Sequence, residues 1–310
     1  MNLIHIGLPK AASTTLQSNI FRTQERFANF GKVNNTYQNE VARGLIGRIL
    51  FQDSVVYDSK SVENMVGQLR AGLAAQGDGR PLLFSDEALS VEGYVDRRII
   101  ATRLYDLFSP AKILIVLRSQ TSMLKSFYLH AVKSGGERRS FATWLKANYA
   151  GISFPTKWRI GLDYNALVGV YEEIFGPQNT VIVLLEEMHD YRTDFFNQLQ
   201  NILGIPAQDI HLCLSRARDN ERMSYRHGLF LKLQSLLPAG NNLALTGRGM
   251  MPLAIYDLMH QWVVSGRRIN FPEMPPEWEA EIYRRCAHQN AILAERRGLP
   301  LEDLGYPYER

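Results

Sequence analysis

Residues 3–17 read Leu-Ile-His-Ile-Gly-Leu-Pro-Lys-Ala-Ala-Ser-Thr-Thr-Leu-Gln. The apolar run at the start predicts a buried strand, and the small residues after Gly7 predict a tight loop. The hydroxyl residues from Ser13 open a helix that we expect to reach about Phe27. Backbone N–H groups converge where such a loop enters a helix, and the helix dipole adds positive charge there. The stretch therefore predicts a phosphate-binding corner.

The loop can be aligned with the phosphate loop of nucleoside triphosphatases, G-x-x-x-x-G-K-[ST]. Gly7 then takes the first glycine position, Ala12 the second, Ser13 the lysine position and Thr14 the hydroxyl position. The lysine of that motif reaches the β and γ phosphates, so its replacement argues against a nucleoside triphosphate. The cation of this loop is Lys10, nearer the mouth of the loop, where it can face the bond being broken. The pattern indicates transfer of a group other than the phosphoryl group of a nucleoside triphosphate.

The run Pro9-Lys10-x-Ala12-Ser13-Thr14 resembles the 5′-phosphosulfate-binding loop, P-K-x-G-[ST]-T, of sulfotransferases that use 3′-phosphoadenosine 5′-phosphosulfate (PAPS). Ala12 stands where that family usually has glycine, and we expect it to keep a negative φ because a methyl group disfavours the left-handed region. An ordinary helix entrance with Ser13 as N-cap is the alternative. The resemblance implies that the loop binds the cofactor through Lys10, Ala11, Ala12, Ser13, Thr14 and Thr15.

Composition sets broad limits on the function. The 310 residues are 45% hydrophobic and 21% charged, which suits a globular protein with a sizeable core. A net charge of +4 suits an anionic ligand but is too small to indicate nucleic acid. The two cysteines, Cys213 and Cys286, each lack a second metal-ligating pair, so no metal site is expected. With no signal peptide or membrane span visible, we expect a cytoplasmic protein.

Strand and helix patterns alternate along the first two thirds of the chain. Buried strands are predicted at 82–84, 112–117 and 180–185, and helices at 61–75, 122–133, 140–149, 164–175, 191–203, 224–236, 251–264 and 276–297. This alternation predicts an α/β fold of three layers, with helices on both faces of a mostly parallel central sheet and a nucleotide-binding arrangement of the phosphate-loop type. We expect a single domain over 1–310, with an α/β core at about 1–206 and a helical part at about 207–310.

A second phosphate-binding site is predicted at the end of strand 112–117. Arg118 closes the strand and Ser126 follows eight residues later in the next helix, so both can turn toward one pocket at the sheet edge. The PAPS-dependent family has this pairing, and the resemblance implies that Arg118 and Ser126 hold the 3′-phosphate. The alternative is an arginine paired with a surface carboxylate. Arg222, in a basic stretch, is a weaker candidate for a nucleotide contact.

Sulfuryl transfer needs a cation at the leaving phosphate and a base for the acceptor. We expect Lys10 to stabilise the bridging oxygen and Glu87, at the end of strand 82–84, to take the acceptor proton. Asp86 is the neighbour that can replace Glu87, since alternation along the chain turns only one of the two inward. The other interpretation of this acid pair is a helix cap or a surface turn.

The sequence thus favours an enzyme that transfers a sulfuryl group from PAPS to a hydroxyl or amine of a carbohydrate or another small acceptor, without a metal. A phosphotransferase of the kinase class and a nucleotide-binding protein without catalysis are the competing functions. The acceptor and the oligomeric state lie beyond the sequence, because substrate-facing loops vary freely on such folds.

Overall fold

The computed structural model describes residues 1–91, 95–133, 137–149, 162–190, 192–216, 262 and 272–309. The chain divides into two compact units, of which the first comprises Met1–Gln120, Pro155–Asp219 and Ile282–Arg310 and the second Thr121–Phe154 and Asn220–Glu281. Whether these units form the expected single domain stays a prediction.

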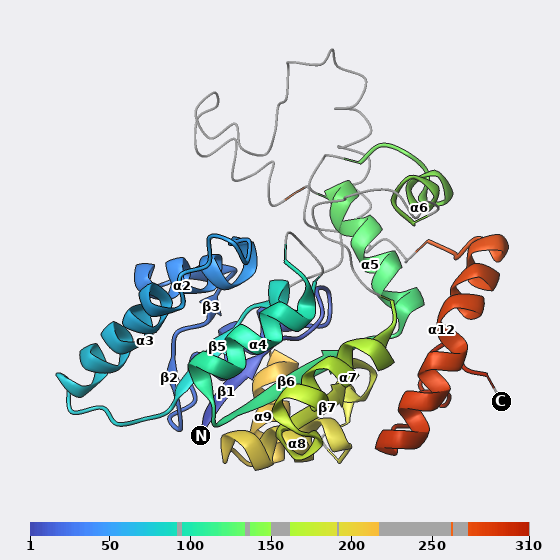
Figure 1. The fold of residues 1–310 in the computed structure, drawn as a ribbon. Helices are drawn as coiled ribbons and strands as arrows, with labels where there is room; N and C mark the ends of the chain where they lie inside the picture. The colour runs from blue at the N-terminus through green and yellow to red at the C-terminus, as the bar shows by residue number, and fades with distance from the viewer. Residues whose placement is uncertain are drawn as a thin grey trace. The chain divides into compact units, whose positions relative to one another are not determined.

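A five-stranded parallel sheet forms the centre of the first unit (Figure 1). In spatial order its strands are β2 (Ala28–Asn29), β5 (Leu82–Ser85), β1 (Asn2–His5), β6 (Ala111–Leu117) and β7 (Thr180–Leu184). β1 lies between β5 and β6, with Ile4 opposite Phe84 on one side and Ile113 on the other. The continuous apolar run of β6 is buried almost throughout, as a strand covered on both faces requires. The predicted parallel sheet is confirmed.

Helices cover both faces of this sheet. In the first unit they are α1 (Ser13–Leu16), α2 (Glu40–Phe51), α3 (Ser59–Ala74), α4 (Arg97–Phe108), α7 (Tyr164–Phe175), α8 (Asp194–Leu203), α9 (Ala207–Arg216) and most of α12 (Pro276–Arg297). The steps from β5 to β6 and from β6 to β7 run in the same direction, so right-handed crossovers put α4 and α7 on one face, where they contact each other. The step from β1 to β2 runs the opposite way, which puts α1 on the other face. The three-layer α/β prediction is confirmed.

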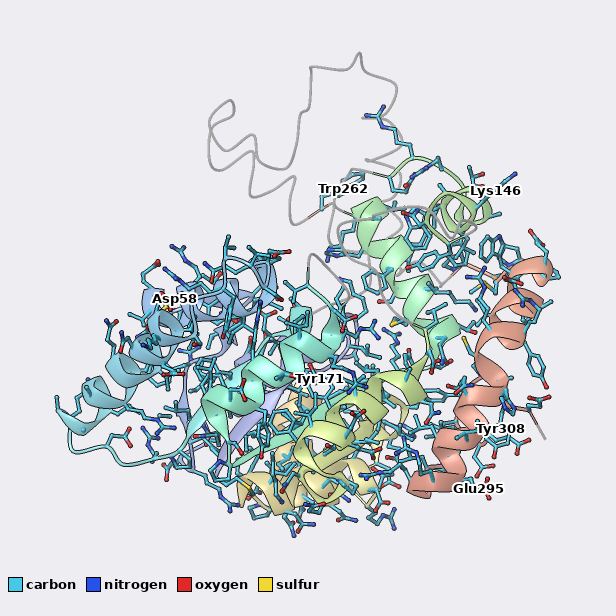
Figure 2. The ribbon with its side chains drawn as sticks, in the orientation of Figure 1. Asp58, Lys146, Tyr171, Trp262, Glu295 and Tyr308 are labelled. Atoms are coloured by element: carbon cyan, nitrogen blue, oxygen red, sulfur yellow. The ribbon has the colours of Figure 1, made fainter. Side chains whose placement is uncertain are left out.

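Local sequence explains where the helices begin and which side they bury. Asp58, which is labelled in Figure 2, caps α3 by accepting a hydrogen bond from the N–H of Ser61. Asp163 caps α7 in the same way through the N–H of Ala166. The hydroxyl of Tyr171, on the buried side of α7, donates to the carbonyl of Leu89 at 2.8 Å. Capping residues therefore set where these helices begin, and buried side chains set which side of each helix packs against the rest of the unit.

The described residues of the second unit include α5 (Gln120–Lys133) from Thr121 on, α6 (Phe141–Tyr149) and the start of α12. Aromatic rings join α5 and α6: Tyr128 of α5 lies 5.0 Å from Phe141 and 5.8 Å from Trp144, between ring centroids. The Tyr128 hydroxyl also donates to the carbonyl of Arg139 at 2.9 Å. This pair of helices has its own small aromatic core.

Several predicted boundaries differ from the observed ones. The first helix does not reach Phe27, because α1 passes into a π-helical turn, η1 (Gln17–Phe21), and the chain then enters β2. The helices predicted at 224–236 and 251–264 lie, apart from Trp262, outside the described residues. Among the described residues, no helix combines the length and apolar character needed to cross a membrane.

Candidate active site at the carboxyl ends of three neighbouring strands

Two residues of the loop after β1 have a left-handed backbone conformation. Lys10 has a φ of 65° and Ala12 a φ of 58°, so both residues lie in the region that glycine usually occupies. The expectation that Ala12 keeps a negative φ was therefore wrong. A methyl group in this conformation costs about 1–2 kcal/mol, which the surrounding hydrogen bonds must offset.

Those hydrogen bonds fold the loop back on itself and onto the sheet. The N–H of Ala11 donates to the carbonyl of Leu8 at 3.1 Å, and the Ser13 hydroxyl donates to the same carbonyl at 3.3 Å. The N–H of Leu8 donates in turn to the carbonyl of Val116 in β6 at 3.1 Å. Three contacts thus anchor one residue, Leu8, and leave the following turn little freedom.

The helix entrance is not the serine cap that we considered as the alternative. Ala12 is the N-cap residue of α1, it has no side-chain capping bond, and Ser13 is the first helical residue. The first helical bond runs from the N–H of Leu16 to the carbonyl of Ala12 at 3.0 Å. The N–H groups of Ser13, Thr14 and Thr15 precede that bond, so they have no acceptor within the helix and point out of its end. Such a set of donors suits a phosphate or sulfate group.

Gly7 is required by close packing against His5. A Cβ atom built on Gly7 would lie 2.3 Å from Nε2 of the His5 ring, which is far too close. His5 is fully buried, and this desolvation lowers its pKa to about 4, while the Glu87 carboxylate raises it in part. The imidazole is therefore neutral at pH 7, and it packs against Gly7 at the start of the loop after β1.

Arg118, at the end of β6, reaches the same loop. One terminal nitrogen of its guanidinium donates to the carbonyl of Lys10 at 2.6 Å, and its own carbonyl accepts from the Tyr164 hydroxyl at 2.7 Å. The structure thus brings Arg118 and Lys10 together. Ser126 lies on α5 within the second unit, and its pairing with Arg118 stays a prediction. Arg222 lies outside the described residues.

The two acids that follow β5 lie in different surroundings. The Asp86 side chain is 4% exposed, and it accepts from the N–H of Ala88 and the hydroxyl of Tyr37 at 2.9 and 2.7 Å. The Glu87 side chain is 27% exposed, and its carboxylate lies 3.5 Å from the Lys32 ammonium and 3.5 Å from Nε2 of Gln17. The Asp86 carboxylate therefore serves to hold the local fold through its hydrogen bonds, whereas the Glu87 carboxylate is exposed enough to contact a ligand.

A short β-hairpin supplies the partners of these acids. It pairs β3 (Lys32–Val33) with β4 (Thr36–Tyr37), and its register places Lys32 directly opposite Tyr37. The Lys32 ammonium lies 2.7 Å from Oδ1 of Asp86 and 3.5 Å from Oε1 of Glu87. A single cation thus bridges both carboxylates of the acid pair.

Burial and charge compete at this cluster. Burial favours the neutral form of Lys32, but the carboxylates of Asp86 and Glu87 outweigh it and the lysine pKa is raised. Burial also raises the pKa of Asp86, and the Lys32 ammonium opposes that rise. For Tyr37, burial and the neighbouring Asp86 raise the pKa, so the phenol stays protonated and donates. We conclude that Lys32 is charged at neutral pH.

A polar chain links this cluster to the loop. Nδ1 of His5 lies 2.7 Å from the Ser85 hydroxyl, and Nε2 of Gln17 donates to that hydroxyl at 3.0 Å. The same Gln17 nitrogen reaches Oε2 of Glu87 at 3.5 Å. Gln17, which directly follows α1, thus connects the helix entrance after β1 to Ser85 and to the candidate base Glu87.

The turn after β6 is held by residues from the other end of the chain. Oδ1 of Asn290 in α12 accepts from Nε2 of Gln120 at 2.9 Å, and Nδ2 of Asn290 donates to Oε1 of Gln120 at 3.2 Å. The Glu186 carboxylate accepts from the N–H of Ser119 at 2.9 Å and from the Tyr306 hydroxyl at 2.8 Å. These bonds fix the backbone that presents Arg118.

Sequence reasoning placed Ser85 at a strand end but missed the roles of Lys32, Tyr37 and Gln17. The detectable signal was Asn34-Asn35 between Val33 and Thr36, because asparagine tolerates left-handed backbone and paired asparagines favour a tight hairpin turn. Asn34 and Asn35 have φ values of 50° and 61°. Nothing in the local sequence indicated that this hairpin would reach the acid pair.

Comparisons with known proteins rest on structure. No family model matches the sequence, and no curated protein does. The fold is similar to the crystal structure of a sulfotransferase from Alicyclobacillus acidocaldarius, with a TM-score of 0.53 and 18% identity over 98% of each chain. The sulfotransferase domain from the curacin biosynthetic pathway matches at a TM-score of 0.41 and 13% identity, over 70% of this chain and 78% of that one, a likeness too slight to support an argument. The chain therefore has a sulfotransferase-like fold.

Proposed function

We propose that this protein transfers a sulfuryl group from PAPS to a hydroxyl or amine of a carbohydrate or another small acceptor. One observation carries the proposal. Three adjacent parallel strands, β5, β1 and β6, are followed by Glu87, by the Lys10 loop and by Arg118. One edge of the sheet thus holds a candidate base, a candidate cation for the leaving group and a candidate phosphate-binding arginine. Ligands of such folds bind at this edge.

The residues present fit a nucleotide with phosphate groups at both the 5′ and 3′ positions. The outward N–H groups of Ser13, Thr14 and Thr15 suit the 5′ phosphosulfate, together with Lys10, Ala11 and Ala12 of the same loop. Arg118 has five N–H donors, so its bond to the loop carbonyl is compatible with a second bond to a 3′-phosphate. Ser126 and Arg222 complete this proposed set of nucleotide contacts.

Each reactive role falls to a residue with suitable chemistry. When bound, PAPS supplies the sulfuryl group and a phosphate leaving group. Glu87 accepts the proton that the acceptor hydroxyl loses as its oxygen bonds to sulfur. Lys10 stabilises the negative charge that collects on the phosphate oxygen as its bond to sulfur breaks. Asp86 is too enclosed by Lys32, Tyr37 and the Ala88 N–H to take over as base.

The nucleotide is tested by calorimetric titration with adenosine 3′,5′-bisphosphate, the product of the reaction. We expect the wild type to bind and Arg118→Ala to bind more weakly by about 1.5–3 kcal/mol, the value of a charge-assisted hydrogen bond. Arg98→Ala is the matched control, because that arginine pairs with Glu173 on the surface of the same unit, and it should bind as the wild type does. Absence of binding in the wild type would refute the proposal.

The competing functions have their own outcomes. Tight binding of the bisphosphate without transfer from PAPS to a broad acceptor panel would favour a nucleotide-binding protein without catalysis. Magnesium-dependent consumption of ATP would favour a phosphotransferase, although Ser13 at the lysine position of the triphosphatase motif argues against it.

A further inference from the structure

The peptide group that joins Arg118 to Ser119 is held from both sides. Its carbonyl oxygen, which belongs to Arg118, accepts from the Tyr164 hydroxyl at 2.7 Å. Its N–H, which belongs to Ser119, donates to Oε1 of Glu186 at 2.9 Å. The C=O and N–H of a trans peptide point in opposite directions, so the two partners lie on opposite sides of one rigid plane. Rotation of that plane would break both bonds.

The two partners of this peptide group are themselves held. Oε2 of Glu186 accepts from the Tyr306 hydroxyl at 2.8 Å. Burial and the neighbouring Glu186 raise the pKa of Tyr306, so its hydroxyl stays protonated and can donate. The rings of Tyr164 and Tyr306, both buried, meet edge to face with their centroids 6.4 Å apart. Two tyrosines and one carboxylate thus form a single packed group around the peptide.

The side chain of Arg118 extends from this fixed backbone toward the phosphate loop. Arg118 is partly exposed, whereas Ser119 beside it is buried. One terminal nitrogen of the guanidinium donates to the carbonyl of Lys10 at 2.6 Å, so the arginine is held at its backbone and at its tip. A side chain held in this way loses little conformational freedom when it binds a ligand, and such preorganisation raises affinity.

We propose that Tyr164 and Glu186 are positioning residues: by holding the peptide group that follows Arg118, they orient its guanidinium toward the 3′-phosphate of the nucleotide. This inference rests on the proposed function, in which Arg118 binds that phosphate. Neither positioning residue needs to touch the nucleotide, because each acts through the backbone of Arg118. Their contribution should therefore appear in the affinity for the 3′-phosphate and not in the affinity for the rest of the nucleotide.

The test compares two nucleotides by calorimetric titration: adenosine 3′,5′-bisphosphate and adenosine 5′-monophosphate, which lacks the 3′-phosphate. The ratio of their dissociation constants measures what the 3′-phosphate contributes, and we expect the wild type to prefer the bisphosphate. Tyr164→Phe removes only a hydroxyl and should lower this preference about 3- to 10-fold, as expected for residues in one hydrogen-bond network. Arg118→Ala should remove most of the preference, and adding Tyr164→Phe to it should change the preference no further.

Tyr171→Phe is the matched control. Tyr171, labelled in Figure 2, lies about two turns further along α7 than Tyr164. It is also fully buried, and its hydroxyl also donates to a backbone carbonyl, that of Leu89 at 2.8 Å. The control therefore deletes the same kind of bond from the same helix, and it should leave the preference for the bisphosphate unchanged.

A preference that is unchanged in Tyr164→Phe would overturn the inference, as would an equal fall in Tyr171→Phe or a wild type that binds both nucleotides equally. Should Tyr164→Phe fail to fold, Tyr306→Phe gives the same test from the other side of the peptide group, because it releases the Glu186 carboxylate. A wild type that binds neither nucleotide ends the proposed function. Binding with an unmoved preference in Tyr164→Phe ends the roles of Tyr164 and Glu186 alone.

Discussion

Replacing Ala12 by glycine should stabilise the protein, although the change removes a methyl group from a residue in the loop that we propose binds the cofactor. Ala12 has a φ of 58° and a ψ of 19°, a conformation that costs an L-residue about 1–2 kcal/mol relative to glycine. Glycine in turn makes the unfolded chain more flexible, which costs about 0.5–1 kcal/mol. The balance favours Ala12→Gly by about 0.5–1 kcal/mol.

Ala11→Gly is the matched control, one residue earlier in the same loop. Ala11 is fully buried and has no left-handed backbone, so glycine there removes a packed methyl group and adds flexibility to the unfolded chain. We expect a loss of about 1–2 kcal/mol from those two contributions.

Differential scanning calorimetry under identical conditions measures both variants. In a chain of this size we expect Ala12→Gly to raise the unfolding temperature by about 1–3 °C and Ala11→Gly to lower it by a similar or larger amount. If the two variants lost stability equally, the loop would not hold Ala12 in the left-handed region and the energetic reasoning would be refuted.

Three other predictions concern the same region. Gly7→Ala should destabilise the protein by about 1–3 kcal/mol because its Cβ meets the His5 ring, and combining it with His5→Ala should recover part of the loss in a double-mutant cycle measured by urea unfolding. The lowered pKa of His5, about 4 against 6.5 for the free side chain, means that the unfolded state binds the proton first as the pH falls. Stability should therefore drop by roughly 3 kcal/mol between pH 6.5 and 4, and urea midpoints for His5→Gln should lack that part of the slope. Lys10→Ala and Glu87→Gln should each lower turnover with PAPS by at least about 100-fold while leaving the unfolding temperature near that of the wild type, and an unimpaired rate would remove the residue from the mechanism.

The sequence was informative where one physical signal dominates. In the strand predicted at 112–117, the apolar run from Ile113 to Leu117 favours a strand covered on both faces, and the observed β6 is Ala111–Leu117. The helix predicted at 164–175 matches α7, because its cap at Asp163 and the apolar stripe through Leu167 and Tyr171 agree. Strands and helices of this kind place Arg118 and Glu87 at one sheet edge without any tertiary information.

The sequence was misleading where tertiary contacts override local preference. Alanine by itself avoids positive φ, but the bonds to the Leu8 carbonyl and the Arg118 contact with the Lys10 carbonyl hold the turn on either side of it. The hairpin of residues 32–37 is too short for a periodic pattern to reveal it. Its role depends on Lys32 meeting Asp86, which lies 54 residues away in the sequence.

The bonds after β6 have a consequence for the order in which the protein assembles. The Ser119 hydroxyl donates to the carbonyl of Gly305, 186 residues later, and Tyr306 fixes the carboxylate that holds the Ser119 N–H. Closing so long a segment carries a large entropic cost, so we expect the turn beside Arg118 to mature after the sheet has formed. In pulsed hydrogen exchange during refolding, the amide of Leu8 should become protected before that of Ser119. Newly folded molecules would then pass through a stage in which the sheet is complete but the turn that presents Arg118 is not yet fixed.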